Sequence, residues 1–316
     1  MTQDLPDWPL FGLADDQRPA LRRLREAGEP AVLATIAGLS GGGPRPVGAQ
    51  MVFGRAFVSG FLSGGCVEGD VALHAAACLT DGEPRRLVYG EGSPWPDIRL
   101  LCGARIEIEL QRIAPDDAAI GAVLAAMDAR RPATWTTAGG LDLTYDPAWR
   151  MVVLGADPTA LAAAMLAAQA GFETTLVRPR GPRACPLAGV AYSRAEPAAA
   201  LAGLDAWTAV AICGHDMELD HAALLAALPG PAPYVGLLGA RRRLGERLER
   251  LRAAGLTESQ LQRLRAPIGL DLGGKAPWEI AVAVVGEVIA LRHSGGQVGR
   301  LAASLSSAPG LSPSRV

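Results

Sequence analysis

The sequence lacks an apolar run long enough to cross a membrane. Its longest apolar stretches are cut by Asp205 in one case and by Glu287 in another, and neither reaches the roughly 18 residues that a membrane-spanning helix needs. Residues 1–16 carry acids and lack the basic and apolar regions of a secretory signal. These two absences predict a soluble, cytoplasmic protein that has no membrane partner.

Cysteine and excess charge are also scarce. The 5 cysteines are scattered along the chain, and a cytosolic compartment keeps thiols reduced, so we expect free thiols and no disulfide framework. The formal net charge of −2 provides no large positive field of the kind that attracts nucleic acid. We therefore expect no nucleic-acid partner.

The length and the hydrophobic content predict two compact units. The 316 residues are about twice the usual size of one domain, and the 49% of hydrophobic residues provide enough material for two cores. We place the boundary near residue 149. Residues 294–316 are rich in Ser, Gly and Pro and show little apolar periodicity, so we expect a disordered tail there.

The first half mixes strands and helices, whereas the second half alternates them regularly. In the first half we expect helices at 16–27, 67–79 and 116–129, strands at 31–37, 50–53, 56–62 and 105–111, and a linker or hairpin at 136–150. In the second half we expect strands at 151–154, 173–177, 189–192, 207–212 and 234–238, and helices at 158–170, 196–203, 217–228, 241–254 and 277–291. Such alternation implies parallel βαβ units. The fold class is thus α/β, with a mixed α/β domain over 1–149 and a Rossmann-like parallel-sheet domain over 150–293.

The segment 63–70, Ser-Gly-Gly-Cys-Val-Glu-Gly-Asp, is the first candidate site. A strand that ends in paired glycines before a helix lets backbone N–H groups converge on an anion. Cys66 lies at the predicted helix start, where a thiol becomes a better nucleophile or soft-metal ligand. Glu68 and Asp70 would disfavour a bound phosphate unless they point away. A tight turn with two helix-capping acids and a small buried cysteine is an equally good interpretation.

A second candidate is the loop 43–50, in which two prolines flank Arg45. An arginine held in a stiff loop can bind a phosphate through two N–H groups. Without other information, an exposed surface loop is the simpler interpretation of this segment.

Taken together, these segments closely resemble the signature of the XdhC/CoxI family, the xanthine dehydrogenase accessory proteins. The resemblance rests on Ala34-Thr35-Ile36, on the segments 43–51 and 63–71, and on several motifs of the second half. Those motifs are Gly214-His215-Asp216, Tyr234-Val235-Gly236, Leu238-Gly239-Ala240-Arg241-Arg242, and the segment 266–273 with Pro277, Glu279 and Glu287. The resemblance covers nearly the whole chain from Ala31 to Ala290.

The resemblance implies a protein that binds the molybdenum cofactor, a molybdopterin. It implies further that the protein shields the cofactor while a cysteine desulfurase installs a terminal sulfido ligand. The cofactor then passes to a molybdenum hydroxylase apo-enzyme of the xanthine dehydrogenase type. The resemblance also implies a homodimer, and it implies an accessory factor more than an enzyme.

A nicotinamide-dependent oxidoreductase is a competing interpretation. A dinucleotide fingerprint needs glycines at three positions after the first strand of the second half, and these positions hold Gly155, Asp157 and Ala160. Asp157 puts a negative charge where the backbone should approach a pyrophosphate. Arg178 stands near the position of the acid that would hold a ribose hydroxyl. NAD binding is therefore disfavoured, and this turn also departs from the family, whose members have more glycine and a histidine here.

Later loops of the second half offer further candidates. Arg241 and the two arginines after it begin a predicted helix, where an anion would offset the repulsion from the helix dipole; guanidinium groups that reach into water are the alternative. Loops after parallel strands line one crevice, so we expect Gly155, His215, Arg241 and Asp271 to face a common pocket. For Asp216 and His221 we favour a helix cap and a surface residue over metal ligands.

Cys66 is the candidate molybdenum ligand or persulfide acceptor, and Cys102 matches a family Cys-Gly position and is expected near it. A thiol-based redox sensor that uses these two cysteines remains a third interpretation. Cys78, Cys185 and Cys213 are expected to be structural. The full set of candidate cofactor-binding residues is Arg45, Gln50, Gly64, Gly65, Cys66, Glu68, Cys102, Gly155, His215, Arg241 and Asp271.

Overall fold

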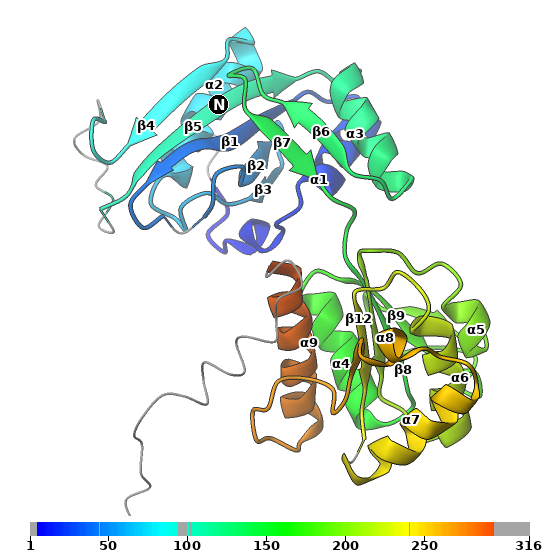
Figure 1. The fold of residues 1–316 in the computed structure, drawn as a ribbon. Helices are drawn as coiled ribbons and strands as arrows, with labels where there is room; N and C mark the ends of the chain where they lie inside the picture. Colours follow the sequence, from blue (N-terminus) through cyan, green and yellow to red (C-terminus); the bar gives the residue numbers. More distant parts are fainter. Residues whose placement is uncertain (1–4, 44, 94–99, 101–102, 240, 294–316) are drawn as a thin grey trace, which may run out of the picture. The chain divides into compact units, whose positions relative to one another are not determined.

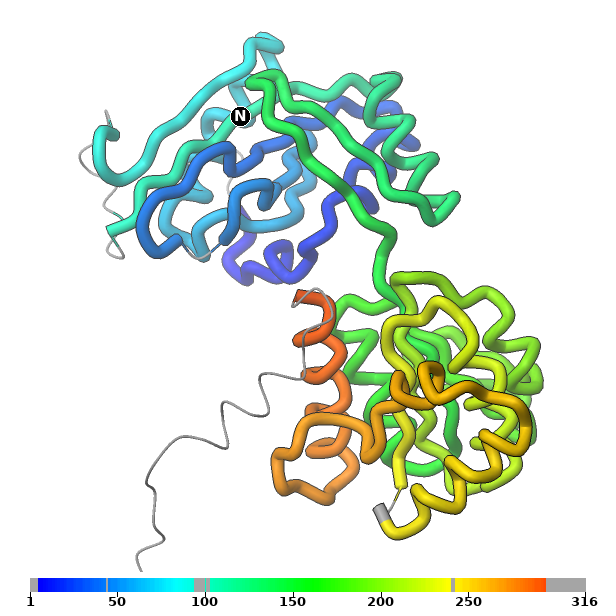
Figure 2. Tube along the Cα trace, in the orientation of Figure 1, coloured from blue at the N-terminus to red at the C-terminus, as the bar shows by residue number. Residues whose placement is uncertain are grey.

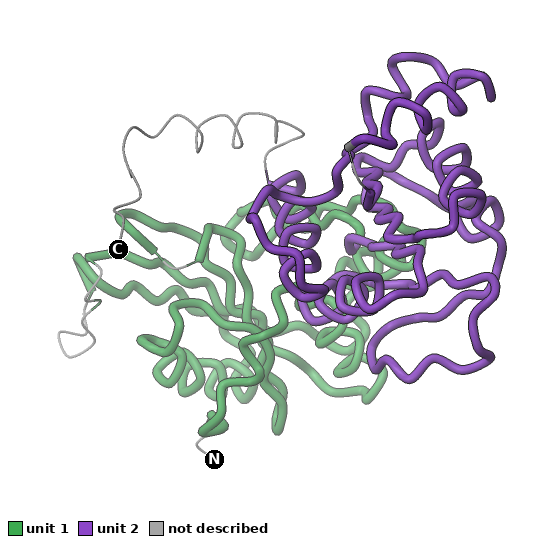
Figure 3. The backbone as a smooth tube through the Cα atoms, turned by 90° about the horizontal axis from the view of Figure 1, so that it is seen from below, with its two compact units in different colours: residues 1–147 green, residues 148–316 purple. Residues whose placement is uncertain are grey.

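A computed structural model describes residues 5–43, 45–93, 100, 103–239 and 241–293. The chain divides into two compact units, residues 1–147 and 148–316 (Figure 3). The expected tail at 294–316 and the candidate Cys102 lie outside the described residues. No helix in the described ranges is long and apolar enough to cross a membrane.

The first unit is built on a five-stranded antiparallel sheet with the order β3-β2-β1-β5-β4 (Figure 1). Its strands are β1 (Ala31–Ser40), β2 (Gln50–Phe53), β3 (Val58–Gly60), β4 (Arg85–Tyr89) and β5 (Arg105–Ile113). In β5, Ile106, Ile108 and Leu110 are buried and alternate with partly exposed residues. This is the period-two pattern of a strand that buries one face.

Helices cover both faces of this sheet. Helix α2 (Glu68–Asp81) packs on one face, where Val71 and Ala75 join the core beneath the central strands. The other face carries α1 (Arg18–Glu26), α3 (Ala118–Asp128) and a hairpin of β6 (Ala133–Thr136) and β7 (Asp142–Tyr145). The short 3-10 helix η1 (Leu10–Leu13) lies beside β3.

The second unit contains a six-stranded parallel sheet with the order β10-β9-β8-β11-β12-β13. Its strands are β8 (Arg150–Leu154), β9 (Glu173–Val177), β10 (Ala191–Ser193), β11 (Thr208–Ile212), β12 (Tyr234–Leu237) and β13 (Leu264–Arg265). The chain enters at β8, proceeds to one edge, and returns to place β11 on the other side of β8. This is the strand order of the doubly wound Rossmann fold, with its topological switch point between β8 and β11.

Two helical layers enclose the parallel sheet (Figures 1 and 2). Helices α4 (Pro158–Gln169) and α9 (Pro277–His293) pack against each other and share one core with the sheet. Residues from or next to α5 (Pro197–Ala200), α6 (Met217–Ala227), α7 (Leu244–Ala253) and α8 (Glu258–Leu261) form the core on the other face. The predicted α/β fold class, with a parallel-strand second half, is confirmed.

Several elements differ from the sequence prediction. The helix expected at 241–254 begins with a 3-10 turn, η2 (Arg241–Arg243), before α7, and the strand expected at 56–62 shortens to β3. We predicted no element at β4, β13, α8 or η1. Elements η1, α8 and β13 have only two to four residues, and β4 begins with two arginines that hide its apolar pattern.

A buried polar contact joins α9 to the start of β12. The Tyr234 hydroxyl donates to Glu287 Oε2 at 2.6 Å, and the backbone N–H of Gly269 donates to the same oxygen at 2.9 Å. Burial, together with the neighbouring Glu287 carboxylate, raises the pKa of Tyr234 well above its ordinary value, so the phenol keeps its proton. The two hydrogen bonds fix the long final helix against the sheet.

Replacing Glu287 should therefore destabilise the second unit. In Glu287→Ala, the buried Tyr234 hydroxyl and the partly buried N–H of Gly269 lose their acceptor, so we expect a loss of about 3 kcal/mol in the free energy of unfolding. Calorimetric unfolding of the full chain measures this loss. Glu249→Ala, on an exposed site of α7, is the matched control and should change stability by less than about 0.5 kcal/mol. Equal effects from the two variants would contradict this role of Glu287.

Candidate functional site

The turn between β3 and α2 carries the first group of candidates. Gly64 and Gly65 both have positive φ, +85° and +112°, a conformation that residues with a side chain adopt only with strain. An added Cβ at either position would meet no atom within 4 Å, so the backbone conformation is what requires glycine. The two residues turn the chain sharply, and the backbone N–H groups of the turn point toward one place.

The carboxylate of Glu68 occupies that place. It accepts hydrogen bonds from the backbone N–H groups of Leu62, Ser63, Gly64, Gly65 and Val67, at 2.6 to 3.2 Å, and from the hydroxyl of Ser63. The side chain of Ser63 in turn accepts from the N–H of Cys66 at 2.9 Å and of Val67 at 3.0 Å. Glu68 is only 3% exposed, so the first residue of α2 holds the turn from inside.

The structure differs from the anion site that we predicted at this turn. We expected the N–H groups of the turn to converge on a ligand anion, but they converge on the chain's own carboxylate. The reason is that Glu68 follows the turn closely enough to reach back into it. Burial alone would raise the pKa of Glu68; the hydrogen bonds from Ser63 and Leu62 outweigh that effect and hold the pKa below its ordinary value. Glu68 therefore stays ionised and fills the site.

Cys66 remains available at the surface of this turn. It directly precedes Val67, the N-cap of α2, and it is an exposed free cysteine. The alternative of a small buried cysteine is therefore wrong for Cys66, although it fits Cys78 and Cys213, which are both fully buried. Burial raises the pKa of the Cys213 thiol to about 12 and also raises that of Cys78. These two thiols suit a structural role.

Asp70 also has a partner within the first unit. The hydroxyl of Tyr89 on β4 donates to Asp70 Oδ2 at 2.6 Å, and Nε2 of His74 lies 3.6 Å from the same oxygen. Burial first, and then the contact with Asp70, raises the pKa of Tyr89. Asp70 therefore joins α2 to the sheet. The carboxylate that accepts from the N–H groups of the turn is that of Glu68.

Arg45 and Gln50 are both engaged within the first unit. Arg45 forms an ion pair with Asp15, and its guanidinium lies over the ring of Phe61 with its central carbon 4.6 Å from the ring centre. Gln50 is buried; its amide donates to Thr35 at 3.2 Å and accepts from the hydroxyl of Tyr145 at 3.0 Å. The structure thus gives Gln50 a place in the interior, next to the β6–β7 hairpin.

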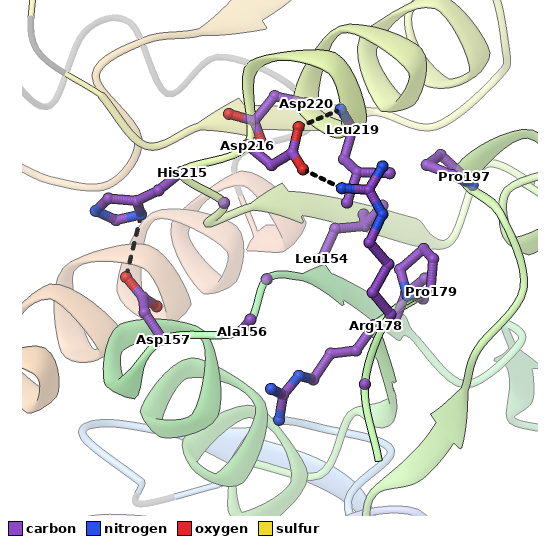
Figure 4. Close-up of a pocket in the computed structure, with 15 residues that line it drawn as sticks. Leu154, Ala156, Asp157, Arg178, Pro179, Pro197, His215, Asp216, Leu219 and Asp220 are labelled. Carbon is purple, nitrogen blue, oxygen red and sulfur yellow. Dashed lines mark hydrogen bonds and ion pairs between the residues drawn. The ribbon is translucent and has the colours of Figure 1, made fainter. Parts of the chain in front are cut away.

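A pocket opens at the switch point of the second unit. It has a volume of about 340 Å³ and lies at the carboxyl ends of β8, β9 and β11 (Figure 4). Its lining comprises Leu154, Gly155, Ala156, Asp157, Val177, Arg178, Pro179, Arg180, Gly181, Pro197, Gly214, His215, Asp216, Leu219 and Asp220. A Cβ at Gly155 would lie 2.6 Å from the Cβ of Ala160 and 2.7 Å from the carbonyl oxygen of Cys213, so only glycine fits this point of contact between two loops.

Gly155 and His215 are two candidates that share this pocket, whereas Asp271 does not line it. The expectation of a common pocket is wrong for Asp271, and the side chain of Arg241 lies outside what the structure describes. Strands β12 and β13 lie on the far side of β11 from β8. The loops that follow those strands are thus displaced laterally from the switch point. Asp271 is exposed in the loop before α9, and Arg241 begins η2.

Asp157 and Asp216 cap the two helices that start at the pocket. Asp157 accepts from the N–H of Ala160 at 2.9 Å at the start of α4, and Asp216 accepts from two N–H groups at the start of α6. The predicted capping role of Asp216 is confirmed. Within the described ranges there is no group of three His, Cys, Asp or Glu side chains that could hold a metal ion.

Sequence reasoning missed the two arginines of this pocket. Arg178 and Arg180 follow β9 directly, and we noted Arg178 only because an acid was missing there. An Arg-Pro-Arg sequence immediately after the second strand of a βαβ unit was the signal that could have identified them. Arg180 donates to Asp216 Oδ2 at 2.9 Å.

Comparisons with known proteins identify relatives along most of the chain. A family model described as the XdhC Rossmann domain matches residues 151–288, and one described as the XdhC and CoxI family matches residues 24–90. The molybdenum cofactor insertion chaperone PaoD of Escherichia coli (strain K12) is 33% identical over 305 residues, which span 89% of this chain and 90% of that protein.

Two further matches are more distant. A protein of Bacillus subtilis (strain 168) named as a probable xanthine dehydrogenase subunit is 27% identical over 330 residues, covering 86% of this chain and 96% of that protein. A crystal structure described as a xanthine dehydrogenase from Bacillus halodurans has a TM-score of 0.74 at 22% identity, covering 93% of this chain and 98% of that one. The structural match shows a shared fold.

Replacing the Glu68 carboxylate should loosen the turn. Glu68→Gln keeps the size of the side chain but puts an amide nitrogen among N–H donors, so we expect a loss of about 3 kcal/mol in the free energy of unfolding. Chemical denaturation of the full chain, with hydrogen exchange of residues 62–67, measures this. Glu83→Gln makes the same chemical change at an exposed position of the same unit and should be neutral. Unchanged exchange in Glu68→Gln would contradict the structural role.

The stabilisation from Glu68 should depend on pH. Because its pKa is lower in the folded chain than its ordinary value of 4.5, the unfolded state binds the proton more readily. The stability advantage of the native protein over Glu68→Gln is therefore complete above pH 4.5 and shrinks as the pH falls through the folded pKa. Unfolding curves of both proteins from pH 7 to about 3 test this sign. An advantage that grows with acidity would refute it.

Proposed function

This chain belongs to the XdhC and CoxI family, and from that premise we propose that it binds the molybdenum cofactor, protects it during sulfuration and delivers it to a molybdenum hydroxylase of the xanthine dehydrogenase type. The proposal is supported by the match to a relative named a molybdenum cofactor insertion chaperone, which extends over both units. A match confined to one unit would support a shared domain alone.

The observation that carries the proposal is the position of Cys66. This thiol is exposed on a turn that a buried carboxylate and two glycines hold in one conformation. A thiolate is a soft ligand that suits molybdenum, and a fixed backbone lowers the entropy lost when a ligand binds. Cys66 is therefore the proposed point of contact with the cargo, while Glu68 positions it.

Cys66 also suits a role in sulfuration. A cysteine desulfurase carries a persulfide, and the Cys66 thiolate can attack the outer sulfur of that persulfide. The outer sulfur then bonds to Cys66, and the thiolate of the desulfurase leaves, so no external oxidant or reductant is required. A cysteine desulfurase is accordingly the proposed second partner.

The remaining cofactor-binding candidates are still proposals, and the roles proposed for them differ. Gly64 and Gly65 shape the Cys66 turn, whereas Arg45 would have to give up its ion pair with Asp15 before it could bind a phosphate. We also propose that the protein acts in the cytoplasm, where Cys66 would remain reduced, and that it forms a homodimer as the family resemblance implies.

Cofactor retention tests the proposal. The purified protein is incubated with molybdenum cofactor and passed through gel filtration, and molybdenum and pterin are measured in the protein peak. We expect near-equal amounts of both with the native protein and at least about tenfold less with Cys66→Ala, a loss of about 1.4 kcal/mol or more in binding. Cys185→Ala, a free cysteine of the other unit, should retain both. If the native protein retains neither molybdenum nor pterin, the proposal is wrong.

A further inference from the structure

The switch-point pocket contains charged residues that the proposed delivery function does not use. Two of its three carboxylates have an arginine partner, and the third lies near a histidine. Asp157 lies 3.4 Å from Nδ1 of His215, Asp216 pairs with Arg180 at 2.9 Å, and Asp220 pairs with Arg247 at 3.0 Å. Asp220 is buried, so its pair with Arg247 forms part of the floor. Asp216 and Asp220 are therefore neutralised by arginines within the unit.

Arg178 is the cation of the lining for which the described residues provide no ion pair. Its Nε is buried and has no hydrogen-bond partner. Figure 4 shows dashed contacts at Asp157 and Asp216 but none at Arg178. A buried guanidinium nitrogen without a partner costs free energy, and an anion bound beside it would remove that cost. Arginine is also the side chain best suited to a phosphate, because its fork of N–H groups matches two phosphate oxygens.

The rest of the lining is mainly apolar. Leu154, Val177 and Leu219 come from the sheet and from α6, and Pro179 and Pro197 add two rigid rings. A volume of about 340 Å³ is near the lower end of the range for small-ligand sites, so the pocket suits a mononucleotide better than a dinucleotide. An apolar slot beside an arginine that has no ion pair within the described residues fits a planar base with a sugar and a single phosphate.

The start of α4 is not available for that phosphate. Asp157 caps the helix by accepting from Ala160, and its carboxylate would repel a pyrophosphate at the usual place in a Rossmann unit. The anion position therefore shifts along the sheet edge to the end of β9, where Arg178 lies. In this fold, an arginine after the second strand is positioned for the ribose end of a nucleotide.

We propose that the switch-point pocket binds a nucleoside monophosphate group, with the phosphate against Arg178 and the base among Val177, Pro179 and Pro197. The ligand is either a free nucleotide or the nucleotide end of a larger cofactor, since both present the same chemistry. The inference stands independently of molybdenum binding at Cys66, because it concerns a pocket of the second unit and a different ligand group.

Calorimetric titration with AMP, GMP, CMP and UMP, and separately with inorganic phosphate, tests this inference on the full chain. We expect at least one nucleotide to bind with a Kd below about 1 mM and at least about tenfold more tightly than phosphate. Arg178→Ala should weaken binding at least tenfold. Arg183→Ala removes an exposed arginine from the same loop outside the pocket and should leave the Kd unchanged.

Each result decides the matter. If none of the nucleotides binds to the native protein, or if Arg178→Ala and Arg183→Ala bind equally well, the proposal is wrong. If inorganic phosphate binds as tightly as every nucleotide, the place assigned to the base is wrong.

A second experiment distinguishes a free nucleotide from the nucleotide end of a larger cofactor. In it, the preferred nucleotide is added to protein that has retained molybdenum cofactor. Release of pterin indicates the nucleotide end of a cofactor, and simultaneous binding indicates a free nucleotide. Cofactor retention by the native protein, measured on its own, separates failure of this inference from failure of the delivery proposal.

Discussion

The first unit depends on the burial of one carboxylate. An ionised carboxylate removed from water is costly unless hydrogen bonds replace its hydration, and Glu68 receives five from backbone N–H groups and one from Ser63. The same bonds satisfy N–H groups that the turn would otherwise leave unpaired before α2. Two glycines allow the backbone to adopt this shape. The consequence for function is that Cys66 is presented at the surface by a turn whose conformation is fixed before any ligand arrives.

A related principle shapes the second unit, in which acids cap helices and pair with cations around the switch point. Asp157 and Asp216 neutralise the starts of α4 and α6, so the pocket lacks the open helix start that attracts a pyrophosphate in other Rossmann units. Arg178 is then the arginine of the lining whose buried Nε has no hydrogen-bond partner. The fold therefore keeps the crevice of a nucleotide-binding sheet while it changes where an anion can bind.

Local features of this chain were predictable from sequence, and contacts between distant segments were not. The bounds of β2 and β9 match the expected ranges, because apolar runs bounded by glycine, proline or polar residues determine them locally. The family resemblance is confirmed over most of the chain. The destination of the Glu68 carboxylate depends on backbone dihedral angles, and the separation of Asp271 from the pocket at Gly155 depends on the lateral order of strands. Spacing along the sequence places Glu68 close to the turn, but it determines neither the dihedral angles nor the order of the strands.

Delivery is the central claim, and reconstitution of a client enzyme tests it most directly. The protein loaded with sulfurated cofactor is mixed with a xanthine dehydrogenase-type enzyme that lacks its cofactor, in the presence of an oxidant that destroys free cofactor. We predict that the loaded protein restores hydroxylase activity under these conditions and that an equal amount of free cofactor does not. Equal activity from free and protein-bound cofactor, or no activity from either, would contradict the account.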